Sequence, residues 1–115
     1  MNKEELRSDF MDEREKLNET LMKYAGMNIK RFFNLDTNAY REGALPVKTK
    51  EMLGLVASVV LRCDDCIKYH LIRCDEEGVT DEEFEEVMSI ALVVGGSITI
   101  PHLRRAFAKW DKREQ

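Results

Sequence analysis

The sequence predicts an all-α fold. Apolar residues recur at helical spacing along most of the chain, and no stretch alternates polar and apolar residues for long enough to form a sheet. Two prolines and six glycines leave long stretches uninterrupted. The chain has 115 residues, of which 43% are hydrophobic, so it can form one domain with a sizeable core. We therefore expect a single domain over residues 1–115, built from about six helices.

The first expected helix covers residues 3–24. Its opposite face is dense in charged residues, and its apolar residues form one stripe at steps of four and seven: Leu6, Phe10, Leu17, Leu21 and Tyr24. Gly26 ends this helix, a short second helix is expected over 27–34, and residues 36–43 should form a short helix or a loop. Apolar stripes on both terminal helices leave apolar surface uncovered, so we expect the segment 1–25 to contact another subunit.

Pro46 opens the next expected helix, over 47–61, because a proline's missing N–H is not needed at a helix start. The residues that we expect on its buried apolar face are Leu53, Val56, Ala57, Val60 and Leu61, with Val59 beside them. A further helix should begin at the cysteine pair near residue 63 and end at Gly78.

The C-terminal part of the chain contains two more expected helices. Thr80 and Glu83 form a capping box, after which apolar residues follow with helical spacing: Phe84, Val87, Met88, Ala91 and Leu92. Gly95 and Gly96 break this helix, and Pro101 opens the last one. Its expected apolar face carries Leu103, Phe107 and Trp110.

The charge pattern excludes several classes of partner. The net charge is −4, and the Lys and Arg residues near the C-terminus alternate with Asp and Glu. Nucleic-acid binding draws most of its affinity from a basic face and is therefore not expected. No segment reaches the roughly 18 apolar residues of a membrane span, and the charged start lacks the apolar region of a signal peptide. We expect a cytoplasmic protein with no membrane partner.

The run from Cys63 to His70 carries most of the chemistry that the sequence predicts. Cys63 and Cys66 are three residues apart, and His70 follows one helical turn after Cys66. On a helix the two cysteine Cα atoms lie roughly 5–6 Å apart, within disulfide range. In the cytoplasm such a pair is more often catalytic or metal-binding than structural. Free N–H groups at the helix start favour a thiolate, whereas Asp64 and Asp65 disfavour it, so the net effect stays open.

The same run also matches a zinc pattern, because Cys74 follows His70 by four residues. On one helix, however, Cys74 lies about 16 Å along the axis from Cys63. No Gly or Pro between residues 63 and 77 would allow the tight turn that a zinc site needs. We therefore expect no metal and a Cys74 that behaves as a small buried side chain. A helical or zinc-binding module without catalysis is the alternative, which metal analysis would decide.

Glu51 completes the predicted site. It precedes Cys63 by twelve residues, which is about 18 Å along a straight helix. If the chain reverses near residue 62, Glu51 and His70 come to lie near the same level of two adjacent helices. Glu51 could then orient His70, and His70 could accept a proton from the Cys66 thiol, as in other activated nucleophiles. The predicted catalytic residues are Glu51, Cys63, Cys66 and His70.

This pattern resembles the motif of the AhpD-like proteins in the carboxymuconolactone decarboxylase superfamily. Glu51 is followed, after eleven residues, by Cys63-x-x-Cys66-x-x-x-His70. The flanking residues are similar as well, with Leu45 to Lys50 before the motif and Gly95-Gly96 and a further helix after it. The resemblance covers roughly residues 30–110.

The resemblance implies an all-helical fold that assembles into homo-oligomers, as trimers or hexamers. It implies peroxidase or disulfide-reductase activity in antioxidant defence, with a hydroperoxide or a disulfide as substrate and a dithiol or a protein as reductant. Cys66 would react with the peroxide, and Cys63 would close the redox-active disulfide without any other cofactor. Glu51 and His70 would relay protons.

The chain departs from the pattern at one place. AhpD itself has a small polar residue and a histidine between its cysteines, where this chain has Asp64 and Asp65. Superfamily members that decarboxylate a muconolactone generally lack the cysteine pair, so its presence favours redox chemistry. The alternative is a non-redox enzyme that acts on a small lactone or keto acid, with Glu51 and His70 as acid–base groups. His102 could approach the site if Gly95-Gly96 folds the last helix back.

Overall fold

The structure is a computed structural model that describes residues 3–113, with side chains from residue 9 onward. The described chain forms six α-helices and one short 3-10 helix, and it contains no strand, which confirms the all-α prediction. The elements are α1 (Lys3–Tyr24), α2 (Met27–Ala39), α3 (Val47–Val60), α4 (Asp64–Glu76), α5 (Asp81–Gly95), η1 (Ser97–Thr99) and α6 (Ile100–Lys112). Within residues 3–113, no helix has both the length and the apolar character to cross a membrane.

Most helix ends lie at the residues that the sequence predicts. Gly26 and Pro46 are the N-caps of α2 and α3, and Gly78, with φ of 82°, follows α4. Glu83 N–H donates to the Thr80 hydroxyl at 3.1 Å, and the Glu83 carboxylate accepts from the Thr80 N–H at 2.9 Å. This capping box supplies partners for two N–H groups at the start of α5 that would otherwise lack one.

The second helix is longer than predicted. It runs without a break to Ala39, so part of the 36–43 segment that we expected as a loop or a separate helix belongs to α2. The reason is that no glycine or proline occurs between Met27 and Glu42 to stop it. Only residues 40–46 connect α2 to α3.

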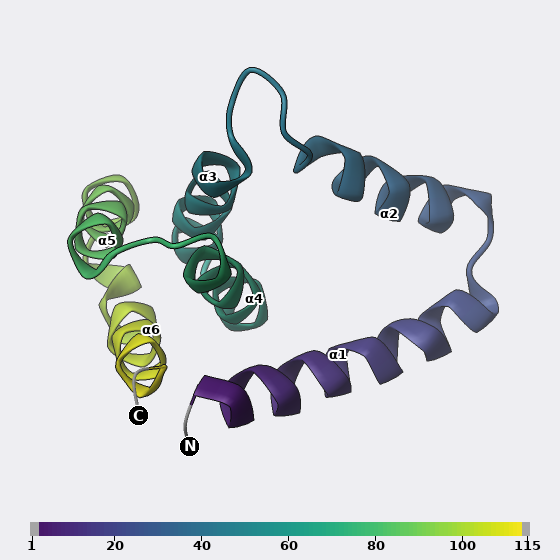
Figure 1. Ribbon diagram of the computed structural model, residues 1–115, viewed down its shortest axis with the longest axis horizontal. Coiled ribbons are helices and arrows are strands. Elements are labelled where there is room, and N and C mark those ends of the chain that lie inside the picture. Colours follow the sequence, from purple (N-terminus) through teal and green to yellow (C-terminus); the bar gives the residue numbers. More distant parts are fainter. Residues whose placement is uncertain (1–2, 114–115) are drawn as a thin grey trace.

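Helices α3 to α6 enclose the hydrophobic core (Figure 1). Helix α3 lies between α4 and α5, and α6 packs against α4. The buried apolar residues of this cluster are Leu55, Val59, Ile67, Leu71, Cys74, Val79, Phe84, Met88, Ala91, Ala106 and Trp110. Phe84 stacks on Trp110 with ring centroids 4.3 Å apart, which joins α5 to the last helix as its predicted apolar face requires.

The predicted buried face of α3 is only partly correct. Val59 is fully buried, and Val56 and Val60 are partly buried against the core. Leu53 and Leu61 are 55% and 76% exposed, and Ala57 is exposed as well. The residues that α3 buries are Glu51, Gly54, Leu55, Ser58 and Val59. Helix α3 has apolar residues on almost every side, so hydrophobicity alone does not choose a face. The side that is buried carries Glu51, Gly54 and Ser58, which are polar or small, so a search for the most apolar face does not find it.

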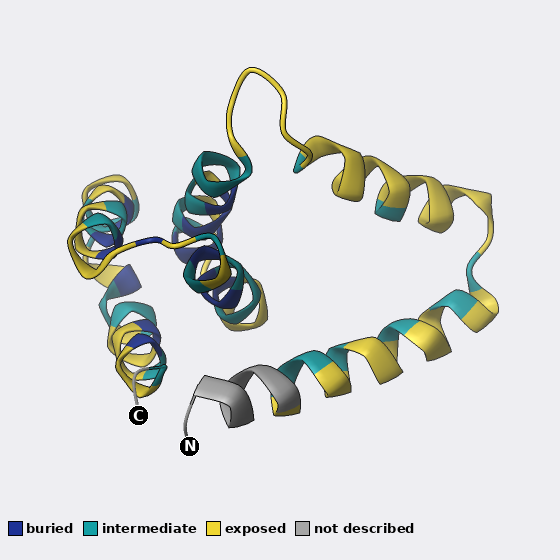
Figure 2. Cartoon of the chain, viewed as in Figure 1, coloured by how far each residue is buried: buried dark blue, intermediate teal, exposed yellow. Residues whose placement is uncertain are grey.

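Helices α1 and α2 form an arm that contacts α4 and α6 through the first half of α1 and then extends away from this core (Figure 1). No residue of α2 is buried, and none of the described side chains of α1 is (Figure 2). The radius of gyration, 14.7 Å, exceeds the roughly 13 Å of a compact chain of this length because the arm projects. The predicted stripe of α1 is exposed at Leu17, Leu21 and Tyr24, whereas Leu6 lies outside the described side chains.

Candidate active site at the start of α4

A tight turn between α3 and α4 brings the predicted site residues together. Arg62 adopts a left-handed conformation with φ of 58°, which is uncommon for a residue other than glycine. The Cys63 N–H donates to the Ser58 carbonyl at 3.1 Å, so the chain reverses directly after Leu61. The reversal that we predicted near residue 62 is therefore present, and α3 and α4 pack side by side.

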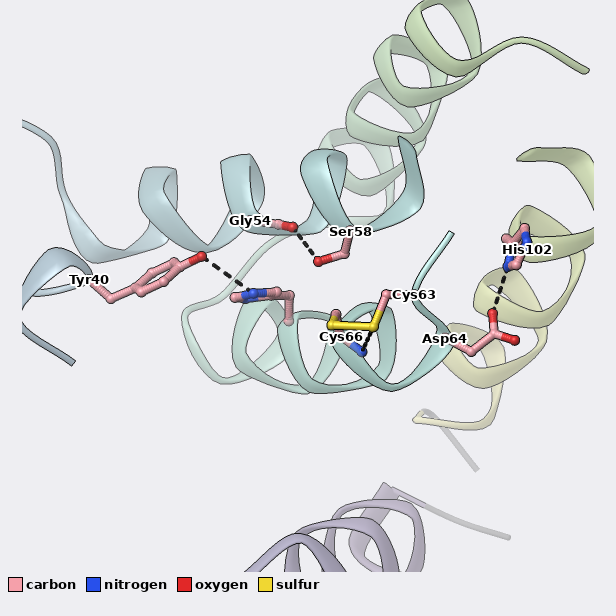
Figure 3. Close-up of a disulfide and its surroundings, with 8 residues drawn as sticks. Tyr40, Gly54, Ser58, Cys63, Asp64, Cys66 and His102 are labelled. Atoms are coloured by element: carbon pink, nitrogen blue, oxygen red, sulfur yellow. Dashed lines mark hydrogen bonds and ion pairs between the residues drawn. A yellow bond between two sulfur atoms is a disulfide. The ribbon is translucent and has the colours of Figure 1, made fainter. Parts of the chain in front are cut away.

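Cys63 and Cys66 form a disulfide at the first turn of α4 (Figure 3). Their Cα atoms are 5.3 Å apart, as expected for the first and fourth residues of a helical turn. Cys63 is the N-cap of α4, and its sulfur accepts the Cys66 N–H at 3.2 Å. Because a helix N-terminus favours negative charge, this position stabilises a Cys63 thiolate whenever the disulfide opens.

Glu51 and His70 form a hydrogen-bonded pair between the same two helices. His70 Nδ1 lies 2.8 Å from Glu51 Oε1, and Glu51 is buried, with only 2% of the residue exposed. Arg73 Nε approaches the other carboxylate oxygen at 3.6 Å, so the buried charge has two partners. In the neutral tautomer that donates from Nδ1 to this carboxylate, Nε2 is the ring nitrogen that can accept a proton.

Tyr40 is a member of the site that the sequence analysis missed. Its hydroxyl lies 3.4 Å from His70 Nε2, and the two rings are 5.3 Å apart at a tilt of 32° (Figure 3). Burial, and then the charge of Glu51, raise the pKa of Tyr40, so its hydroxyl keeps the proton that it can donate. No spacing rule could connect these residues, since thirty positions separate them and Tyr40 belongs to the segment between α2 and α3.

Gly54 provides the space in which Tyr40 and His70 meet. A Cβ at this position would lie 2.6 Å from the Tyr40 hydroxyl oxygen and 2.7 Å from His70 Cε1. Both distances are far shorter than van der Waals contact, so a larger residue would displace the rings. One turn later, the Ser58 hydroxyl donates to the Gly54 carbonyl at 2.7 Å, which satisfies a buried polar group beside the disulfide.

A cavity of about 410 Å³ opens beside the disulfide, between α4 and the arm. Cys66 and His70 both line it, which places the predicted thiol and base on one surface. The other lining residues are Phe10, Glu13, Arg14, Leu17, Asn18, Asp36, Asp65, Lys68 and Tyr69. Cys63 is less exposed than Cys66 and does not line this cavity. Of the two cysteines, Cys66 is therefore the one that borders the cavity.

The two aspartates between the cysteines have different surroundings. Asp65 lines the cavity, whereas the Asp64 side chain points away from the disulfide toward α6 (Figure 3). His102 Nδ1 lies 2.8 Å from Asp64 Oδ1, and Arg105 Nη2 lies 3.1 Å from Oδ2. The last helix therefore folds back toward α4, as we considered for His102. The histidine contacts Asp64 beside the disulfide.

Cys74 stands apart from the reactive pair. It is fully buried in the core, and this burial raises the pKa of its thiol to about 12. Cys74 is therefore the small buried side chain that we expected. Among the described side chains, no group of three or more His, Cys, Asp or Glu residues is arranged to hold a metal ion.

Comparison with known sequences decides the family. Residues 29–109 match the carboxymuconolactone decarboxylase family. The chain belongs to this family. Two proteins with sequence similarity to this family member are an uncharacterized protein of Cupriavidus necator and protein 4 of the cox locus of Paracoccus denitrificans. The first is 30% identical over 64% of this chain and 65% of the relative, and the second is 27% identical over 70% and 73%.

Solved structures of carboxymuconolactone decarboxylase family proteins share the fold. Crystal structures of TM1620 from Thermotoga maritima superpose with TM-scores of 0.88 and 0.86, at 60% identity over 90% of this chain. The match covers 91% and 87% of the two TM1620 chains. A possible part in the antioxidative response has been suggested for TM1620. The family protein lpg0406 of Legionella pneumophila, at 22% identity, has a TM-score of 0.77 over 97% of this chain and 96% of its own.

Proposed function

We propose that this family member is a thiol-dependent oxidoreductase of antioxidant defence that acts as a peroxidase or a disulfide reductase. The observation that carries the proposal is the position of the disulfide. Cys66 opens onto a cavity that His70 also lines, while Cys63 is the N-cap of α4. An activated cysteine requires a base that can accept its proton and surroundings that favour a thiolate. Here His70 would be the base, and the N-terminus of α4 favours negative charge on the sulfur. The role suggested for TM1620 agrees with this proposal.

The proposed peroxidase cycle has three balanced steps. The Cys66 thiol gives its proton to His70, and the thiolate attacks the outer oxygen of a hydroperoxide. The oxygen–oxygen bond breaks, a Cys66 sulfenic acid forms, and His70 returns the proton to the departing alkoxide, which leaves as an alcohol. The Cys63 thiol then attacks this sulfur, which forms the disulfide and releases water. A dithiol donor finally reduces the disulfide and becomes a disulfide itself. Glu51 keeps the Nδ1 hydrogen on His70 throughout, so that Nε2 can exchange protons.

Peroxide-dependent loss of thiols tests this cycle directly. We expect the reduced wild type to lose two thiols for each hydroperoxide consumed, and Cys66→Ser to lose the rapid phase. Cys74→Ala is the matched control, because it removes the buried cysteine and should leave the rate unchanged. Equal rates for wild type and Cys66→Ser would remove Cys66 from the mechanism. Reduction by several dithiol donors, with the reduction potential measured in parallel, separates a peroxidase from a general disulfide exchanger.

The hydrogen-bonded pair of Glu51 and His70 favours one alternative. A buried carboxylate that orients an imidazole can also serve acid–base chemistry on a small lactone or keto acid. Such an activity would survive the double substitution Cys63→Ser and Cys66→Ser, whereas the redox cycle would not. Assay of lactones with this double variant therefore separates the two functions.

We further propose that the protein acts as a homo-oligomer, a trimer or a hexamer, in the cytoplasm, where dithiol reductants are available. Large apolar side chains are exposed on the arm and on the outer sides of α3 and α5. They include Tyr24, Phe32, Leu35, Leu61, Val93 and Val94. Exposed apolar area of this extent is typical of surfaces that a partner covers. Light scattering that shows a monomer at micromolar concentration would contradict this assembly.

A further inference from the structure

Asp64 connects the reactive disulfide to α6. It is the first residue of α4, directly after the N-cap Cys63, and its two carboxylate oxygens contact two residues of α6. His102 Nδ1 lies 2.8 Å from one oxygen, and Arg105 Nη2 lies 3.1 Å from the other. The hydrogen bond from His102, and then the charge of Arg105, lower the pKa of Asp64, so the carboxylate stays ionised.

This contact affects two opposing electrostatic effects on the Cys63 sulfur at the start of α4. The helix start and the Cys66 N–H stabilise negative charge on the Cys63 sulfur. A carboxylate on the next residue destabilises the same charge, because like charges at short range repel. Arg105 brings a positive charge to that carboxylate, and the contact directs the Asp64 side chain away from the sulfur atoms (Figure 3).

We propose that His102 and Arg105 are positioning residues of the redox pair. They hold Asp64 against α6 and offset its charge, so that Cys63 leaves readily as a thiolate when a dithiol donor opens the disulfide. In that step the donor thiolate attacks the Cys66 sulfur, the sulfur–sulfur bond breaks, and Cys63 takes its electron pair. A second donor thiol then releases Cys66 and completes the donor's own disulfide. This inference rests on the proposed function, because it requires the pair to cycle.

Other charged groups also surround the two sulfurs. The titratable side chains that face the cavity next to Cys66 are Glu13, Arg14, Asp36, Asp65, Lys68, Tyr69 and His70. Glu51 and Tyr40 reach the site through His70, and Lys109 of α6 lies close enough to Asp64 for their charges to interact. Arg105→Gln and His102→Leu leave all of these residues in place. Of the groups named, Lys109 also interacts with the charge of Arg105, and the added Asp64→Asn substitution described below separates the route through Asp64 from any effect through Lys109.

The test measures the reactivity of Cys63 alone. In the variant Cys66→Ser with Cys74→Ala, Cys63 is the single thiol, and its alkylation rate by iodoacetamide is followed from pH 5 to pH 10. We expect Arg105→Gln and His102→Leu to raise the pH of half-maximal reactivity and to lower the rate at pH 7 by roughly threefold, the size of an exposed ion pair. Arg105→Lys keeps the charge and should restore most of the rate.

Arg104→Gln is the matched control, because it removes the same charge from the neighbouring position of α6. The structure gives Arg104 no part in the contact with Asp64, so its profile should coincide with that of the parent. Equal shifts for Arg104→Gln and Arg105→Gln would show a general effect of net charge and would overturn the proposal. A shift that persists when Asp64→Asn is added would overturn it too, since the effect must pass through Asp64.

The intact pair supplies a second readout. With both cysteines present, we expect Arg105→Gln to shift the equilibrium with a dithiol donor about threefold toward the disulfide, which corresponds to about 14 mV. Arg104→Gln should leave the potential unchanged, and an unchanged potential in Arg105→Gln would contradict the proposal. A pair that forms no reversible disulfide would instead refute the proposed function, while the alkylation profile of Cys63 would still decide the role of Arg105.

Discussion

The α3–α6 core and the α1–α2 arm contribute different parts of the candidate site. The core supplies Glu51, His70 and the disulfide at the start of α4, and the segment between α2 and α3 adds Tyr40. The arm buries none of its described side chains, yet Phe10, Arg14 and other residues of α1 form one wall of the cavity beside Cys66. The groups of the proposed chemistry therefore belong mainly to a packed region, whereas the cavity beside them is bordered by an arm that buries none of its described side chains.

The largest expected effect separates the two regions by stability. Phe84 in the core is 1% exposed and stacks on Trp110, so Phe84→Ala should cost about 3–5 kcal/mol of unfolding free energy at any protein concentration. Phe32 on the arm is 65% exposed. Phe32→Ala should change only the concentration dependence of unfolding, because its contacts would come from another subunit. Urea denaturation at several concentrations measures both, and a concentration-independent loss at Phe32 would show that α2 packs on its own chain.

A pair of glycines gives the next sharpest contrast. A methyl group on Gly54 would press on Tyr40 and His70, so Gly54→Ala should lose about 1–3 kcal/mol and slow peroxide-dependent thiol oxidation. Gly26 between the two arm helices has open space around its Cα, so Gly26→Ala should change stability by less than about 1 kcal/mol. Thermal unfolding and the thiol assay check both variants. Normal oxidation by Gly54→Ala would show that the Tyr40–His70 contact is dispensable.

Removing one hydroxyl group from Tyr40 at the site and from Tyr24 on the arm compares the two regions on a finer scale. Tyr40→Phe keeps the ring and removes the hydroxyl beside His70 Nε2, so the oxidation rate should fall about threefold to tenfold, the range of one hydrogen bond. Tyr24 on the arm is 80% exposed and does not line the cavity beside Cys66, which makes Tyr24→Phe the control. Stopped-flow kinetics of the reduced protein would reveal the difference, and equal rates would show that the Tyr40 hydroxyl does not assist His70.

The smallest expected effect is the acid stability that Asp64 contributes. Its contacts with His102 and Arg105 lower its pKa, so its stabilisation is fully present above the unfolded value near 3.8. The contribution is lost as the pH falls through the lower folded value. The melting temperatures of wild type and Asp64→Asn should therefore differ at pH 6 and converge below pH 4. A constant difference over this range would show that the carboxylate charge adds no stability.

The sequence predicted the helices better than their faces. Gly26, Gly78 and Thr80 mark helix ends through local chemistry, so they could be recognised without the fold. Leu53 and Leu61 were misplaced because α3 is apolar on nearly all sides, and only the packing of α4 and α5 decides which side is buried. Local signals set where an element begins and ends, whereas its orientation depends on neighbours that are distant in sequence.

The candidate site shows the same limit. The pairing of Glu51 with His70 followed from counting residues on both sides of one turn, because the two helices are consecutive. Tyr40 and Arg105 were missed because their contacts cross from separate elements. Arg73 could have been found, since it lies three residues after His70 and so on the same side of α4.

The turn at Arg62 has a consequence for how this chemistry could be transferred. Glu51, Cys63, Cys66 and His70 all belong to one hairpin of two helices, residues 51–70, whose register this turn sets. Such a hairpin is a portable unit that a designer could graft onto another helical scaffold with its thiols, imidazole and carboxylate already in register. One inserted residue at the turn would rotate α4 by about 100° and separate the imidazole from its carboxylate.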